Sequence, residues 1–119
     1  MRKTTALATF ALFLAAGTAW AQEPFVRAPL QKSEFPAGYE THIMLVTSAP
    51  GAHLPRHTHP GVEMSYVVEG ELTVTIEGKG DLVVKAGSSF SVPPGAAHSA
   101  RNSASTPTKV LATLASPAP

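Results

Sequence analysis

The chain has 119 residues, with 9 lysine and arginine side chains against 8 aspartate and glutamate side chains, and no cysteine. This length favours one domain over two, and the nearly balanced charge gives no electrostatic footprint for nucleic acid or an anionic membrane surface. Because no disulfide is available, stability must come from a well-closed core, a bound metal or a partner subunit. We therefore expect a small-molecule ligand or substrate, no nucleic-acid partner, and a homodimer.

Residues 1–21 have the pattern of a secretory signal peptide. Arg2 and Lys3 form a positive start, residues 6–16 (ALATFALFLAA) are an apolar run, and residues 19–21 (AWA) supply a small-x-small cleavage pattern. An uncleaved N-terminal anchor is the alternative, but the run is shorter than the roughly 20 apolar residues of a transmembrane helix. We expect cleavage after residue 21 and a periplasmic or secreted protein with no membrane contact once cleaved.

We expect the mature chain, residues 22–119, to form a single domain. Loss of the two basic residues of the signal leaves 9 − 2 = 7 basic against 8 acidic side chains, a net charge of −1 with histidine neutral. That balance again predicts neither a nucleic-acid nor a membrane surface.

After the signal, short runs of β-branched and alternating residues lie between glycine, proline, asparagine and serine punctuation. Residues 23–36 are ambiguous and could add an edge strand around residues 26–30, broken by Pro29. Residues 72–76 (LTVTI) alternate between aliphatic residues and threonines, the period of a half-buried strand. The other predicted strands are residues 41–47, 62–69, 82–85, 88–92, 97–101 and 109–114. Seven or eight short strands indicate an all-β sandwich or barrel; the last four residues, 116–119, are expected to fray.

Two histidines and a glutamate lie close together in residues 57–63, HTHPGVE. In an extended strand residues i and i+2 share a face, so His57 and His59 can direct both imidazoles to one point. The turn signal Pro60-Gly61 allows Glu63 to come alongside from the next strand. Two imidazoles and a carboxylate suit a divalent transition metal such as manganese, iron, copper, nickel or zinc. A turn with surface histidines is the alternative for these three residues alone.

A fourth candidate ligand, His98, follows the Pro93-Pro94-Gly95 turn, and two stretches around these residues match a known family. Residues 51–70, GAHLPRHTHPGVEMSYVVEG, match the first cupin motif, G-x5-H-x-H-x3-4-E-x6-G, at every fixed position. Residues 87–102, GSSFSVPPGAAHSARN, match the second cupin motif, G-x5-P-x-G-x2-H-x3-N, equally completely. The chain therefore resembles a small single-domain exported cupin.

The resemblance implies an all-β jelly-roll barrel, also described as a double-stranded β-helix. It also implies one divalent metal ion, of unknown identity, bound by His57, His59, Glu63 and His98. Three imidazoles and one carboxylate leave two positions open on an octahedral ion, as in sites that meet substrate, water or dioxygen. Glu63 is in addition the candidate catalytic residue, because its carboxylate could shift to accept a proton. Each imidazole should donate its second nitrogen to an acceptor that the sequence does not identify.

The reaction stays open, because cupins with this ligand set include dioxygenases, oxidases, isomerases and proteins without known turnover. We expect a metal-dependent oxidoreductase, dioxygenase-like, that acts on a small molecule. The alternatives are a non-catalytic metal- or small-ligand-binding module and a metal-dependent isomerase that uses the ion as a Lewis acid.

For the other residues of interest, a functional role is less well supported by the sequence than a structural one. His53 and His42 could face the interior by parity, but single histidines are more often packed or surface residues. Arg56 and Arg101 flank candidate ligands and could steer an anion, although exposed strand arginines are common. Structural roles are expected for Phe90 in the core near the metal, for Tyr66 packed on a strand, for Asn102 holding a loop, and for Gly51, Gly70, Gly87 and Gly95 at tight turns.

Overall fold

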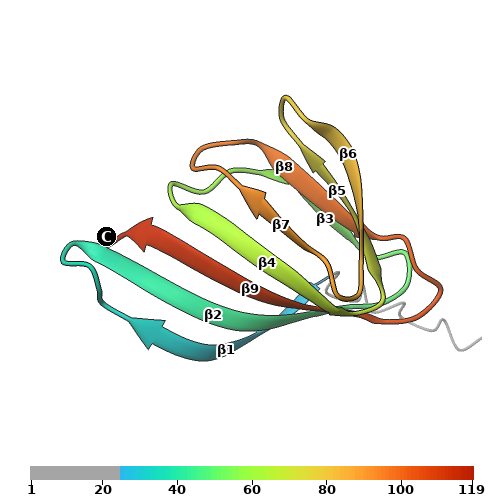
Figure 1. The fold of residues 1–119 in the computed structure, drawn as a ribbon, viewed down its shortest axis with the longest axis horizontal. Helices are drawn as coiled ribbons and strands as arrows, with labels where there is room; N and C mark the ends of the chain where they lie inside the picture. The colour runs from blue at the N-terminus through green and yellow to red at the C-terminus, as the bar shows by residue number, and fades with distance from the viewer. Residues whose placement is uncertain (1–24) are drawn as a thin grey trace, which may run out of the picture.

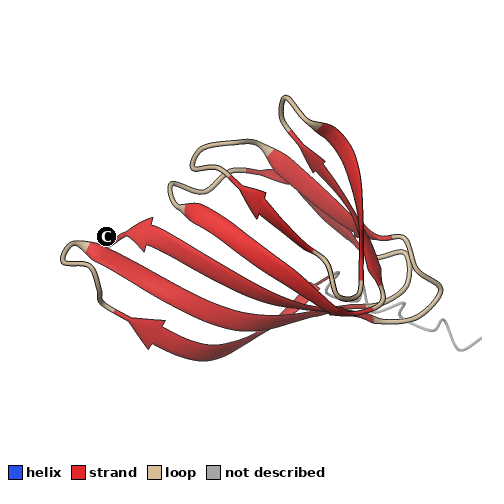
Figure 2. Ribbon diagram, viewed as in Figure 1, coloured by secondary structure: helices blue, strands red, loops and turns tan. Residues whose placement is uncertain are grey.

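The structure is a computed structural model and describes residues 25–119. The predicted signal peptide at residues 1–21 and the first residues of the predicted 22–119 domain lie outside the described residues. Within residues 25–119 all regular secondary structure is β-strand (Figure 2). This part of the chain contains no helix that is long and apolar enough to cross a membrane.

The described residues form two antiparallel sheets that face each other, converging at one end and opening at the other (Figure 1). One sheet has five strands in the order β1-β2-β9-β4-β7, and the other has four in the order β3-β8-β5-β6. This is the all-β jelly-roll fold that the sequence predicts. The strands are β1 (Phe25–Ser33), β2 (Tyr39–Ser48), β3 (His53–His57), β4 (Val62–Glu69), β5 (Glu71–Ile76), β6 (Gly80–Lys85), β7 (Ser89–Val92), β8 (His98–Asn102) and β9 (Thr108–Pro117).

The hydrophobic core lies between the inner faces of the two sheets. In β5 the aliphatic residues of the predicted alternation, Leu72, Val74 and Ile76, are between 1% and 3% exposed. Val67 of β4 and Val92 of β7 close the core from the opposite sheet and are fully buried. Burial of each such side chain contributes about 1.5–3 kcal/mol, so this layer provides much of the stability of a domain without disulfides.

The predicted edge strand is present and is longer than expected, because β1 covers Phe25–Ser33. Among the described strands it pairs only with β2, and its register shifts between Pro29 and Gln31. A proline has no amide hydrogen to donate to a ladder, which is why it is tolerated at an edge or at a bulge.

Two segments differ from the sequence-based expectations. β3 (HLPRH) was not predicted as a separate strand, because it contains a proline and no aliphatic alternation. Within residues 25–119 it pairs only with β8. The expected fraying of the last residues is wrong for Ser116 and Pro117, which pair with Glu40 and Tyr39 of β2 as the end of β9. Pairing with a long neighbouring strand supplies order that the local sequence does not encode.

Candidate metal centre

The four residues with metal-ligand chemistry come from three strands and one connection. His57 is the last residue of β3, His59 lies between β3 and β4, Glu63 is the second residue of β4, and His98 is the first residue of β8. His57 and His98 are direct partners in the β3–β8 ladder, so their side chains share a face of the sheet. The predicted turn before His98 is present, with the Ala96 amide donating to the Pro93 carbonyl at 3.2 Å.

The structure corrects one part of the predicted geometry. His57 and His59 do not lie on one extended strand, because β3 ends at His57 and His59 belongs to the connection that follows. The Gly95 amide donates to the His59 carbonyl at 2.9 Å, so the second motif positions the backbone of the first. Gly61 in the same connection is buried, and a Cβ added there would collide with the Ala115 carbonyl oxygen of β9. Only glycine lets the connection pack this closely.

The three histidines converge in the barrel interior. Their potential ligand atoms lie within 4.8 Å of one another. The ring centroid of His98 lies 4.2 Å from that of His57 and 4.5 Å from that of His59. Three imidazole nitrogens at this spacing form a cluster that could hold one divalent transition-metal ion.

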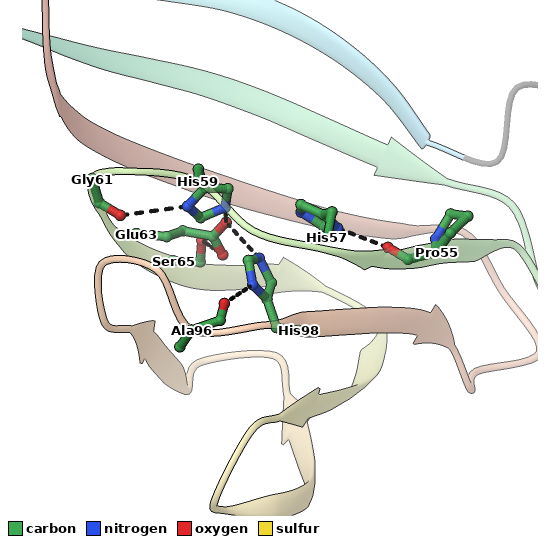
Figure 3. Close-up of polar contacts among 8 residues, drawn as sticks. All are labelled: Pro55, His57, His59, Gly61, Glu63, Ser65, Ala96 and His98. Atoms are coloured by element: carbon green, nitrogen blue, oxygen red, sulfur yellow. Dashed lines mark hydrogen bonds and ion pairs between the residues drawn. The ribbon is translucent and has the colours of Figure 1, made fainter.

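Backbone carbonyls orient each of the three rings, as Figure 3 shows. His57 Nδ1 lies 2.7 Å from the Pro55 carbonyl oxygen, His98 Nδ1 lies 2.9 Å from that of Ala96, and His59 Nδ1 lies 3.4 Å from that of Gly61. A carbonyl oxygen only accepts hydrogen bonds, so in each pair Nδ1 is the donor, and Nε2 of a neutral ring carries the lone pair. These carbonyls are the acceptors that metal-binding histidines require and that the sequence did not identify.

Glu63 lies beside the histidine cluster and faces two of its rings (Figure 3). Its Oε1 is 3.4 Å from His59 Nε2 and 3.9 Å from His98 Nε2. Ser65 donates a hydrogen bond to Oε2 at 3.1 Å and so fixes the orientation of the carboxylate. A carboxylate oxygen that faces two nitrogen lone pairs is repelled by both, unless a positive charge lies between them.

His98 carries the clearest sign of a missing partner. The residue is 3% exposed, and its Nε2 is buried with no hydrogen-bond partner among the described residues. Such an unsatisfied group costs about 1–3 kcal/mol. Burial lowers the pKa of His98 below its ordinary 6.5; the hydrogen bond to the Ala96 carbonyl opposes this shift, and the nearby His57 adds to it. The lowered pKa favours the neutral ring, which is the form that binds a metal.

A cavity of about 180 Å³ adjoins the cluster and is lined by all four candidate ligands. Its walls are mainly apolar and include Met44, Val46, Leu54 and Phe90. The predicted interior position of Phe90 is confirmed, since it packs against the core and lines this cavity.

The weaker sequence candidates lie outside the cavity. His53 is exposed, and His42 Nε2 lies 3.1 Å from Glu40 Oε2, as in a local surface pair. Arg56 and Arg101 are exposed, and the expected packing of Tyr66 is wrong, because this side chain is 47% exposed on the outer face of β4. None of these five residues lines the cavity in the described part of the chain.

Two polar residues of the cavity, Arg27 and Ser65, were not predicted from the sequence. Ser65 is two residues after Glu63 on the same strand, and its shared parity was a usable signal. Arg27 lies in β1, and nothing local to its sequence indicates which face it occupies, because that depends on the register with β2.

Comparison with known proteins identifies the family. The family model described as "Cupin domain" matches residues 44–114, which is more than half of the chain. The protein therefore belongs to the cupin family. No protein among those with curated functions matches it significantly.

Three similar solved structures agree with this assignment. The Cnp3 cupin domain of Schizosaccharomyces pombe is 20% identical, with a TM-score of 0.69 over 82% of this chain and 67% of that one. A structure from Thermus thermophilus is 25% identical, with a TM-score of 0.68 over 82% of this chain and 88% of that one. A recombinant oxalate oxidase in complex with glycolate is 28% identical, with a TM-score of 0.65 over 78% of this chain and 51% of that one. The chain thus spans about half the length of the oxalate oxidase.

Proposed function

We propose that the protein binds one divalent transition-metal ion through His57, His59, His98 and Glu63, and that it is a small exported, dioxygenase-like oxidoreductase acting on a small molecule. The observation that carries the proposal is the convergence of three histidines whose potential ligand atoms lie within 4.8 Å of one another. Each ring is oriented by a backbone carbonyl, and His98 Nε2 is buried with no hydrogen-bond partner among the described residues. This donor set fits manganese, iron, copper, nickel or zinc.

Protonation of the cluster explains the geometry less well than an ion does. One proton on His59 Nε2 would satisfy its contact with Glu63 and would leave His98 Nε2 buried and unpaired. Three protonated rings with centroids 4.2 to 5.5 Å apart would repel one another. A divalent cation would accept the lone pairs of all three nitrogens and would also balance the charge of the Glu63 carboxylate.

The chain's own residues then have distinct roles in the proposed site. A bound redox-active ion would supply electron transfer with dioxygen and would polarise a ligand oxygen. Ser65 holds Oε2 of Glu63 in place, which leaves Oε1 on the side of the histidines to accept a proton. The mainly apolar walls lower the local polarity around the ligands, which strengthens the electrostatic interactions beside them.

The similarity to oxalate oxidase supports an oxidoreductase that acts on a small, oxygen-rich molecule. That relative is 28% identical and was solved with glycolate. The Cnp3 cupin domain, at 20% identity, supports only the fold. Because fold and ligand set are shared by several chemistries, the reaction has to be decided by experiment.

A non-catalytic binding module is the second candidate, and one observation favours it. The longest connections between strands, residues 34–38, 93–97 and 103–107, have five residues each. Such connections are too short to close over the cavity as a lid, and lids commonly exclude water during reactive chemistry. A metal-dependent isomerase would meet the same objection.

The test is elemental analysis of the protein purified from its natural compartment, followed by oxygen-uptake assays with a panel of small hydroxy- and keto-acids. We expect one equivalent of a redox-active ion and uptake that stops after chelation. One equivalent of zinc without uptake would favour the binding module or Lewis-acid chemistry. Absence of a stoichiometric ion, or full occupancy in both His57→Ala and His98→Ala, would refute the metal site.

The proposal extends to location and assembly. Cleavage after residue 21 would give a periplasmic or secreted protein, which intact mass of the exported form would test. The exposed apolar side chains Val26 and Leu30 on edge strand β1 support a homodimer, because edge strands are templates for pairing. Light scattering should give twice the mass of the mature chain, and a monomeric mass would contradict the dimer.

A further inference from the structure

We propose that the cavity is a binding site for small carboxylic acids, in which Arg27 binds the carboxylate and the histidine cluster faces the other polar end of the ligand. This inference rests on the proposed metal site and adds the chemical class of the molecule that the site binds.

The ladder of the five-stranded sheet places Arg27 on the inner face. Arg27 is paired with Val46 of β2, and Val46 is paired with Val110 of β9. Directly opposed residues of antiparallel strands point to the same face of a sheet. Val46 and Val110 both line the cavity, and Arg27 lines it with them. Phe25, two residues earlier on β1, is buried on this same face.

The arginine is also exposed, which places it at the opening of the cavity. β1 is an edge strand of its sheet, as β3 is of the other, and the cavity contains residues of both. Arg27 therefore lies where a ligand from solvent would enter between the two sheets. Leu54 and His57 of β3 line the same cavity from the opposite sheet.

The charges of the cavity favour an anion. Among the described residues that line the cavity, Arg27 is the one lysine or arginine and Glu63 is the one acidic residue. Within residues 25–119 no ion pair involves Arg27. The charges of Arg27 and Glu63 cancel, so a bound divalent ion would leave the site with its own double positive charge. An exposed guanidinium that takes part in no ion pair is available to bind a complementary charge.

The shape of the guanidinium and the size of the cavity narrow the class of anion. Arginine forms two parallel hydrogen bonds to a carboxylate, which fixes the ligand's orientation. The cavity volume of about 180 Å³ and the apolar side chains of Phe25, Met44 and Leu54 suit a small acid with a short carbon skeleton. An oxygen at the far end of such an acid would face the histidines.

The experiment titrates metal-loaded mature protein with glycolate, succinate and benzoate by calorimetry. Matched titrations use the uncharged counterparts ethylene glycol, 1,4-butanediol and benzyl alcohol. The variants are Arg27→Gln, Arg27→Lys and the control Arg101→Gln, which makes the same charge change on an exposed β8 residue outside the cavity. Metal content is measured for every sample.

We expect at least one acid to bind the wild type, and to bind Arg27→Gln about tenfold to a hundredfold more weakly, the range for loss of a charge-assisted hydrogen bond. Arg27→Lys should retain part of the affinity, and Arg101→Gln should match the wild type. Binding of the uncharged counterparts should not depend on Arg27.

The possible failures separate the two proposals. If the wild type holds no metal, the proposed function fails whatever the titrations show. If the protein is fully loaded and Arg27→Gln binds each acid as tightly as the wild type, the Arg27 inference is overturned while the metal site stands. Failure of all three acids to bind the loaded wild type overturns the inference in the same way.

Discussion

The two ends of strand β8 bury polar side chains in opposite ways. His98 and Asn102 lie four residues apart and are 3% and 2% exposed, and both belong to the second motif. The Asn102 amide donates to the carbonyls of Ser48 and Thr106 at 3.1 and 3.0 Å. Its oxygen accepts from the Ala104 amide at 2.9 Å and from the Thr108 hydroxyl at 3.1 Å. His98 Nε2 has no partner at all in the described residues.

This difference separates a structural polar residue from a ligand-binding one. A fully satisfied buried side chain holds its surroundings in one arrangement, and the predicted loop-holding role of Asn102 is confirmed by its four hydrogen bonds. A buried nitrogen left unpaired lowers stability until a ligand pairs with it. The same strand can therefore be tested for both roles.

The largest effect on stability is expected at Asn102, the end of β8 where the buried side chain is fully hydrogen-bonded. Asn102→Ala removes the side-chain partner of two carbonyls and one amide, and each buried group left unsatisfied costs about 1–3 kcal/mol. The Thr108 hydroxyl keeps its hydrogen bond to the Glu71 carbonyl. The free energy of unfolding should fall by about 3 kcal/mol or more, equally with metal and with chelator, in urea titrations. Ser103→Ala, at the exposed neighbouring hydroxyl, is the control and should change little. If Asn102→Ala lowered the free energy of unfolding only in the presence of metal, Asn102 would not differ from His98 in its role.

A substitution of His98, at the end of β8 with the unpaired nitrogen, should change stability only when metal is present. In chelator, His98→Leu should unfold within about 1 kcal/mol of the wild type, because it loses one hydrogen bond but also removes an unpaired nitrogen. With metal at a hundredfold excess over its Kd, the wild type should gain about 2.7 kcal/mol and His98→Leu nothing. Thermal unfolding with and without added manganese, iron or zinc measures this. A metal-dependent shift that survives in His98→Leu would show that His98 is not a ligand.

A smaller effect is expected at Ser65, which touches the site only through Glu63. Ser65→Ala should weaken metal binding about tenfold, since partners that orient ligands typically contribute tenfold to a hundredfold in affinity. Competition with a chromophoric chelator gives the Kd. Ser91→Ala is the matched control, because Ser91 is exposed on β7 opposite Met64. Equal affinities of the two variants would mean that Glu63 needs no orientation from Ser65.

The contrast also explains which features could be predicted from sequence. The four candidate ligands and Asn102 are side-chain types at fixed spacing, and β5 shows a clear alternation. The partners of the histidine Nδ1 atoms are backbone carbonyls, which every residue carries and which therefore leave no trace in the sequence. The face occupied by Arg27 depends on the β1–β2 register and on its shift between Pro29 and Gln31. A one-residue slip would turn that side chain to the other face.

The smallest effect, the pH dependence of the metal-free protein, follows from the burial of His98. Burial lowers the pKa of His98 in the folded state, while in the unfolded chain it titrates near 6.5. As pH falls below 6.5 the unfolded chain takes up a proton that the folded protein resists, so stability falls until the lowered pKa is passed. Urea titrations in chelator should show this decline in wild type and in Asn102→Ala alike, because Asn102 does not titrate. In His98→Leu the free energy of unfolding should depend less on pH over the same range. If it declines as much as in the wild type, groups other than His98 cause the decline.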